Sequence, residues 1–133
     1  MRVFLDTNVL AAAFAVRGLC SDLMREVIEN HEFVCTTGIL KELRRILDKK
    51  FKMPNAQVDE IIEFVTASVE MSSPVKGAAY DIKDLVDVPH LSAAESSGSD
   101  VFVTGDKELW KVSPLGKMSV CSPRGFWEKI SGR

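Results

Sequence analysis

Two aspartates of this 133-residue chain follow short apolar runs of the kind that form buried strands. Asp6 comes after the run 3–5, and Asp106 follows the run 101–103 by way of a Thr-Gly pair. The carboxyl ends of parallel strands meet at one edge of a sheet, so we expect both carboxylates to face one crevice there. An aspartate after a single strand is often only a turn former. Two at matching positions favour a shared site.

Four further acidic residues are candidates for the same crevice. Glu42 lies at the border of the apolar stripe of a helical pattern, and Asp81, Asp84 and Asp87 precede another helical segment. Both placements also have an ordinary explanation, since charges cover solvated helix faces and carboxylates are favoured near helix N-termini. One of the three aspartates can nevertheless reach the crevice.

Carboxylates gathered in one crevice repel one another unless a cation offsets their charge. Ligation by oxygen alone favours Mg²⁺ or Mn²⁺. His31 and His90 are isolated in the sequence and do not form a zinc-type cluster, so we expect both to be surface or structural residues. The three cysteines have no CxxC spacing, which favours small buried thiols in a reducing, cytoplasmic compartment.

Short apolar runs alternate with amphipathic stretches along the whole chain. We expect strands at 3–5, 33–36, 101–103 and 118–121, with a weak one within 69–75. Helical patterns cover 19–28 with Ser21 as N-cap, 39–47, 58–69, a segment opened by Pro89, a short stretch near 109–110, and 126–130. This order predicts an α/β fold, a three-layer α/β/α sandwich with a mostly parallel central sheet of about five strands. The segments with Gly, Pro and Ser between these elements are too short to be interdomain linkers, so we expect one domain over residues 1–133.

The composition limits the classes of function. Lys plus Arg number 17 against 19 for Asp plus Glu, a net charge of −2, which excludes a nucleic-acid binder that works by bulk positive charge. No apolar run approaches the roughly 20 residues that cross a bilayer, and the start turns acidic too early for a signal peptide.

Local basic and aromatic residues leave nucleic-acid binding open. The basic residues close to the acidic positions are Lys41, Arg44, Arg45, Lys49, Lys50, Lys107 and Lys111. They could bind phosphates or simply form a solvated face. Trp110 and Trp127 could stack on bases, although packing in the core or a dimer is the more common role at helical spacing.

The acidic positions, taken in order, resemble the motifs of PIN-domain ribonucleases. The resemblance rests on Asp6-Thr7-Asn8 after the first strand, residues 37–47 around Glu42, Asp84-Leu85-Val86-Asp87 followed by Leu91 and Ala94, Val103-Thr104-Gly105-Asp106, and the ending Ser122-Pro123 with Phe126. It covers nearly the whole chain and is closest to VapC-type toxins of prokaryotic toxin–antitoxin pairs. Leu85 departs from the proline usual at its position, and the spacing of the aspartates permits two registers. We prefer Asp87 as the essential acid because Leu91 and Ala94 then fall at the family's spacing.

The resemblance implies Mg²⁺- or Mn²⁺-dependent hydrolysis of RNA phosphodiester bonds that leaves 5′-phosphate and 3′-hydroxyl ends. By the same resemblance, Asp6, Glu42, Asp87 and Asp106 would be the catalytic, metal-binding acids, with Asn8, Asp84 and Thr104 as accessory residues. Lys41, Arg44, Arg45 and Lys107 would contact RNA. A cognate antitoxin and a homodimer are the implied partners, and no membrane is involved.

Other readings remain at this point. A housekeeping PIN nuclease or a silent RNA-binding PIN scaffold would share the motifs without the toxin role. A haloacid-dehalogenase-like phosphatase needs a second aspartate two residues after the first, where this chain has Asn8. A receiver-type module needs an acidic pair before its phosphoacceptor, and Asp6 stands alone.

Overall fold

The computed structural model of the chain describes residues 1–131. Their centre is a five-stranded sheet in the order β3-β2-β1-β4-β5, in which every neighbouring pair is parallel. The strands are β1 (Arg2–Leu5), β2 (Glu32–Cys35), β3 (Glu70–Met71), β4 (Val101–Val103) and β5 (Ser119–Cys121). The predicted α/β class and the sheet of about five strands are confirmed.

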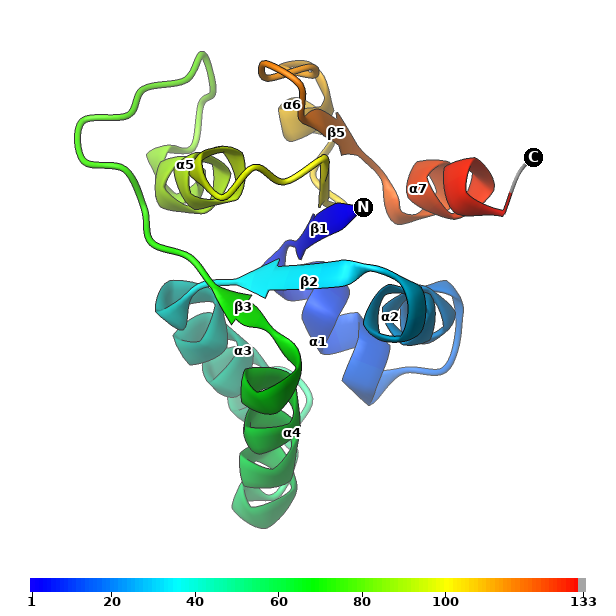
Figure 1. The fold of residues 1–133 in the computed structure, drawn as a ribbon. Coiled ribbons are helices and arrows are strands. Elements are labelled where there is room, and N and C mark those ends of the chain that lie inside the picture. The colour runs from blue at the N-terminus through cyan, green and yellow to red at the C-terminus, as the bar shows by residue number, and fades with distance from the viewer. Residues whose placement is uncertain (132–133) are drawn as a thin grey trace.

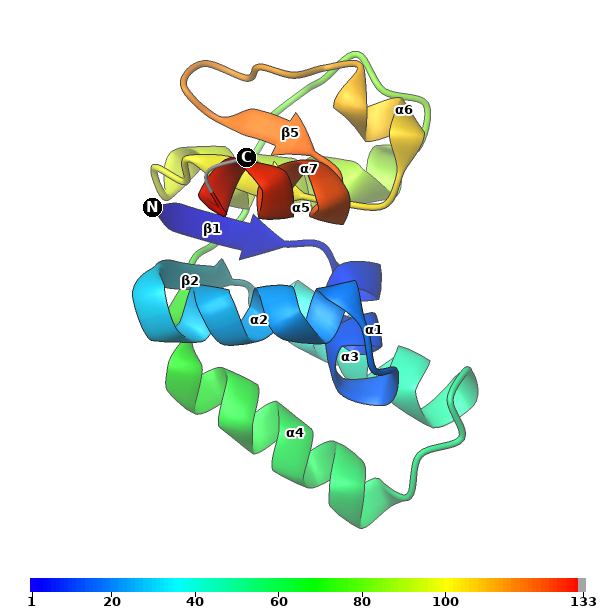
Figure 2. The same cartoon turned by 90° about the vertical axis from the view of Figure 1, so that its right-hand side faces the viewer.

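Helices cover both faces of this sheet. They are α1 (Thr7–Ala15), α2 (Leu19–Asn30), α3 (Thr37–Lys49), α4 (Asn55–Ser68), the short 3₁₀ helix η1 (Leu85–Asp87), α5 (Val88–Ser96), α6 (Lys107–Trp110) and α7 (Pro123–Ile130). Helices α2 and α7 lie on one side of the strands and α5 lies on the other (Figures 1 and 2). The arrangement is the predicted three-layer sandwich.

The central strand β1 and its neighbour β4 are buried on both faces. Val3 pairs in register with Val101, and the rings of Phe4 and Phe102 stack with centroids 5.2 Å apart. Strands that are covered on both faces read as continuous apolar runs without alternation. This is why their short sequences were sufficient to predict them.

The order of the strands reverses at β1, which has a neighbouring strand on each side. Strand β2 comes next in the chain on one side, whereas β4 lies on the other side after a return crossover. Ligand sites of open α/β sheets form where the strand order reverses, outside the carboxyl ends of the strands. The ends of β1 and β4 therefore mark the place for a site.

Some predicted boundaries are wrong. Helix α1 was not predicted, because residues 7–15 are almost all apolar or alanine and show no periodic contrast. The weak strand predicted within 69–75 is confirmed as β3, although it is only two exposed residues long. Helix α2 begins at Leu19 with Gly18 as N-cap, and Ser21 bonds back to both backbone groups of Gly18 instead of capping the helix itself.

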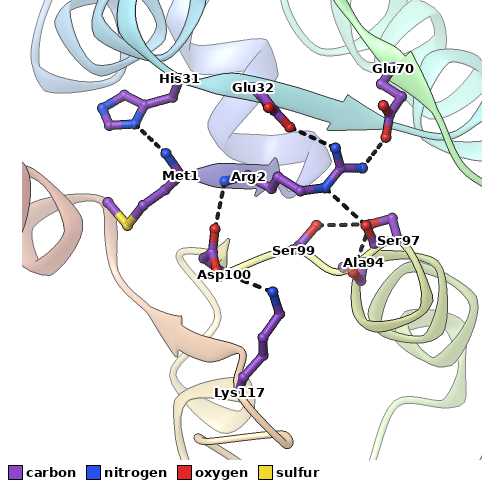
Figure 3. A network of polar contacts seen from close by, with 10 residues as sticks. All are labelled: Met1, Arg2, His31, Glu32, Glu70, Ala94, Ser97, Ser99, Asp100 and Lys117. Carbon is purple, nitrogen blue, oxygen red and sulfur yellow. Dashed lines mark hydrogen bonds and ion pairs between the residues drawn. The ribbon is translucent and has the colours of Figure 1, made fainter.

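The amino ends of the strands are joined by Arg2 (Figure 3). Its guanidinium donates to Glu32 on β2, to Glu70 on β3 and to the Ser97 carbonyl before β4. Its backbone amide donates to Asp100, 2.8 Å away. One side chain thus bonds to two strands and the β4 approach at the edge opposite the carboxyl ends.

Candidate active site

Asp6 is held between the two central strands. Its backbone amide donates to the carbonyl of Val103 (2.9 Å), which continues the pairing of β1 with β4. The side chain caps helix α1, with Oδ1 accepting from the Thr7 amide at 2.8 Å. Oδ2 accepts from the Thr104 hydroxyl at 2.7 Å. The carboxylate therefore has a defined orientation at the carboxyl edge of the sheet.

Asp106 lies beside it at the end of β4. It caps helix α6 through a bond from the Glu108 amide (2.9 Å), and its own amide donates to the Thr104 hydroxyl (3.1 Å). The indole of Trp110 donates to the Thr104 carbonyl at 2.8 Å. Buried Thr104 thus connects both aspartates. Trp110 supports this turn from within the fold, as the packing interpretation of the tryptophans predicts.

Glu42 reaches the same edge from helix α3. Its Oε2 accepts from the Thr7 hydroxyl at 2.8 Å, and its Oε1 lies 3.2 Å from Nε2 of His90 on α5. A buried threonine and a buried histidine therefore hold the two oxygens of this carboxylate. Glu42 is not a freely solvated helix charge, which was the ordinary explanation of its position.

The aspartates ahead of α5 fall into two environments. Asp84 is exposed and caps η1 by accepting from the Val86 amide at 3.0 Å. Asp87 is partly buried at the start of α5 and makes no capping hydrogen bond with its side chain. The third aspartate of this segment, Asp81, contributes to a separate hollow beside α6.

One pocket of about 500 Å³ gathers these groups. Its lining residues are Asp6, Thr7, Asn8, Glu42, Arg45, Ile46, Asp84, Val86, Asp87, Thr104, Gly105 and Asp106. The seven residues predicted as catalytic or accessory are all present in this lining. Of the four predicted RNA contacts, only Arg45 is, and its neighbour Arg44 instead pairs with Asp59 of α4 at 2.7 Å.

The carboxylates affect one another's ionisation. Partial burial raises the pKa of Asp87 to about 6, and the negative charges of three neighbouring aspartates add to this shift. These neighbours are Asp6, Asp84 and Asp106. Burial also raises the pKa of Asp6, although hydrogen bonds from Thr104 and Thr7 oppose the change. The pocket is therefore a region of concentrated negative charge.

The donor set of this pocket fits a hard divalent cation. It offers carboxylate and hydroxyl oxygens without sulfur, and its side chains are the oxygen ligands that Mg²⁺ and Mn²⁺ prefer. Within residues 1–131, no three acidic, His or Cys side chains converge closely enough to hold an ion directly. Mg²⁺ usually keeps several waters and binds through one or two carboxylates, so this spacing is compatible with it.

Sequence reasoning missed two members of the site. Thr7 was read only as part of a motif, and His90 only as a surface or structural residue. Both contact Glu42, from which they are 35 and 48 positions away in the chain. The position of His90 three residues after Asp87, within one helical turn, was the available signal.

Comparison with known proteins identifies the family. The family model described as "PIN domain" matches residues 2–108, most of the chain and all four acidic positions. The chain belongs to the PIN-domain family. No curated protein sequence matches it significantly.

Among solved structures, this PIN-domain chain is similar to a chain in the crystal structure of VapBC2 from Rickettsia felis bound to a DNA fragment from their promoter. The TM-score is 0.65 with 15% sequence identity, and the match covers 92% of this chain and 98% of that one. At this identity the likeness establishes a shared fold. PIN domains are nucleases, so the family sets aside the phosphatase and receiver readings.

Proposed function

We propose that this PIN-domain protein is a divalent-metal-dependent endoribonuclease that hydrolyses RNA phosphodiester bonds to 5′-phosphate and 3′-hydroxyl ends. The observation that carries the proposal is the convergence of Asp6, Glu42, Asp87 and Asp106 on one pocket. They come from separate segments of the chain, and Arg45 is the single basic residue in the lining among residues 1–131, which the structure describes. Carboxylates crowded in this way fit a site that a small hard cation completes.

The residues of the pocket would have different roles around that cation. Bound Mg²⁺ or Mn²⁺ would lower the pKa of a water molecule and neutralise charge on the phosphoryl oxygens. Asp6, Asp87 and Asp106 would hold the ion, directly or through water, and Glu42 would complete the site or orient the attacking water. Thr104 and the Thr7 amide fix the orientation of Asp6 by their hydrogen bonds.

Basic residues at and near the acidic pocket would bind the phosphates of RNA. Arg45 lies on α3 one turn beyond Glu42 and lines the pocket, so its guanidinium can bind a substrate phosphate that flanks the scissile one. Asn8 is exposed at the rim and offers a neutral hydrogen-bonding group. Lys41 and Lys107 are also exposed, outside the lining, where they would contact phosphates further along the strand.

We further propose that the nuclease is the toxin of a toxin–antitoxin pair. The support is its similarity over nearly full length to a chain of the VapBC2 complex. The toxin role would add a cognate antitoxin as a protein partner, a second copy of this chain in a homodimer, and cytoplasmic RNA as target. Across residues 1–131, no helix combines the length and apolar character needed to span a membrane.

The nuclease proposal is tested with purified protein and single-stranded RNA. Asp6→Asn should lower the cleavage rate on the order of 100-fold or more, because the charge that holds the ion is lost. Cleavage by the wild type should require Mn²⁺ or Mg²⁺ and stop in EDTA. Asp22→Asn, at an exposed aspartate of α2 outside the pocket, is the matched control and should cleave normally.

Three results would overturn it. Cleavage that persists in EDTA would exclude a metal-dependent mechanism. Equal activity of Asp6→Asn and the wild type would exclude this pocket as the active site. RNA binding without cleavage, in both Mn²⁺ and Mg²⁺, would identify the chain as a silent PIN scaffold.

The toxin role needs a cellular test. Induced expression should arrest growth, and Asp6→Asn expressed at the same level should not. Co-expression of the protein encoded by the neighbouring gene should restore growth. Normal growth during expression of the active wild type would instead identify a housekeeping nuclease.

A further inference from the structure

Three side chains from three helices form one hydrogen-bonded group that centres on Glu42. His90 of α5 is 5% exposed, and its Nε2 lies 3.2 Å from Oε1 of Glu42. The Thr7 hydroxyl of α1 donates to Oε2 at 2.8 Å. An ionised carboxylate only accepts hydrogen bonds, so the imidazole presents its Nε2–H to Glu42.

We propose that His90 is a positioning residue of the metal site, which together with Thr7 holds the Glu42 carboxylate in one orientation toward the pocket. This inference rests on the proposed nuclease function and goes beyond it. The resemblance to PIN-domain ribonucleases accounts for the acidic positions, and it assigns nothing to position 90.

The need for such a residue follows from the side chain of Glu42. Glutamate has three rotatable bonds, and this one projects from a helix face with 30% of its side chain exposed. Without partners it could turn toward solvent, away from the other carboxylates that repel it. Partners on two different helices fix both of its oxygens and leave further lone pairs free for an ion or its water.

His90 itself has little freedom to move. It is buried, with 5% of its surface exposed, and its ring lies near the first turn of α3, with Cε1 3.8 Å from where a Cβ on Gly38 would stand. The ring does not contribute to the pocket lining, whereas Glu42 does. His90 therefore acts through Glu42 and not on RNA. Partners of this kind commonly change metal affinity or activity by about 10- to 100-fold when they are removed.

The first test measures Mn²⁺ binding to the whole chain by calorimetry, without RNA. His90→Leu keeps an apolar filling but loses the donor, and we expect its Mn²⁺ affinity to fall by about 10-fold or more. His90→Gln places an amide nitrogen near the position of Nε2 and should keep most of the affinity. His90→Asn is polar but too short to reach Glu42, so it should behave like His90→Leu. His90→Asn takes the place of His90→Leu in this test if His90→Leu does not fold.

A double-mutant cycle tests whether His90 acts through Glu42. In the Glu42→Gln background, His90→Leu should cause little further loss of Mn²⁺ affinity. For RNA cleavage, the loss in His90→Leu should appear in kcat, with KM close to that of the wild type. The melting temperature of His90→Leu in EDTA should remain near that of the wild type. A purely structural role for His90 would instead lower it.

The possible failures are distinguishable. If the wild type neither binds Mn²⁺ nor cleaves RNA, the proposed function fails and this inference fails with it. If Asp6→Asn loses both properties while His90→Leu keeps wild-type affinity and kcat, only the inference about His90 is overturned. It is also overturned if His90→Gln is as defective as His90→Leu, or if the loss persists in full beside Glu42→Gln.

Discussion

At the scale of single residues, neighbours decide what each charged group can do. Asp84 and Asp87 are three positions apart and line the same pocket, but the first is exposed and capping while the second is partly buried among other carboxylates. Arg44 and Arg45 are adjacent, and one pairs with α4 while the other faces the acids. Residue type alone does not separate the members of either pair.

The partly buried position of Asp87 should make the stability of the protein depend on pH. Its pKa in the fold, about 6, exceeds the ordinary value of 3.8, so folding favours the protonated form. The contribution of Asp87 to the stability of the metal-free protein should therefore increase as the pH falls from 7 toward 4. Asp87→Asn removes the repulsion and should be more stable than the wild type by about 1 kcal/mol at pH 7, after allowance for solvent screening. Urea unfolding in EDTA should show this difference disappearing near pH 4.

Activity distinguishes the two aspartates further. Asp87→Asn should lose more RNA cleavage than Asp84→Asn, because Asp87 is partly buried among the charges of Asp6 and Asp106, whereas Asp84 is exposed. The reverse order would assign the essential acid to position 84. Stabilisation without any loss of cleavage would show that Asp87 is not part of the active site.

Arg45 should contribute to RNA binding. Arg45→Gln removes a charge-assisted hydrogen bond to phosphate, and we expect KM to rise by about 10-fold with a smaller effect on kcat. Arg44→Gln is the matched control at the adjacent position. It should lose up to about 1 kcal/mol of stability with its exposed ion pair and keep nearly the wild-type KM. Steady-state kinetics with one RNA compares the KM values of the two variants. Equal changes in KM would contradict a phosphate contact at Arg45.

At the scale of elements, strands that are buried on both faces were predictable and the elements at the margin were not. The runs at β1 and β4 are short and apolar, and most of their residues are β-branched or aromatic, which favours strands. Helix α1 has no polar face that contrasts with its apolar one, so periodicity gave no signal there. Strand β3 is exposed, and only its pairing with β2 defines it.

Arg2 stabilises the amino edge of the sheet, so its loss should weaken several elements together. Arg2→Met keeps the aliphatic part of the side chain but removes its bonds to Glu32, Glu70 and the Ser97 carbonyl. We expect a loss of about 1–2 kcal/mol in the free energy of unfolding, smaller in 1 M salt. Urea titration measures it, with Arg25→Met on α2 as an exposed control. Cleavage by the folded variant should be normal because the candidate active site lies at the opposite edge.

At the scale of the whole molecule, the fold concentrates negative charge that a cation would offset. Mn²⁺ should therefore raise the melting temperature, since the unfolded chain does not gather these carboxylates. At about 100 times its dissociation constant, an ion specific for the folded state adds about 2.7 kcal/mol. Thermal melts with Mn²⁺ should show this increase in the wild type and a much smaller one in Asp6→Asn. An unchanged melting temperature in the wild type would contradict the metal site.

The sequence by itself determined the layer order, the parallel sheet and the set of acidic positions. These depend on local patterns, since a strand run, a helical stripe and an acid at a strand end are each contained within a few neighbouring residues. Only the tertiary structure decided which groups meet: His90 with Glu42, Thr104 with Asp6, and Arg45 with the pocket. The physical reason is distance along the chain. Thr104 and Asp6 are 98 positions apart, and no local pattern records a hydrogen bond that two packed strands create.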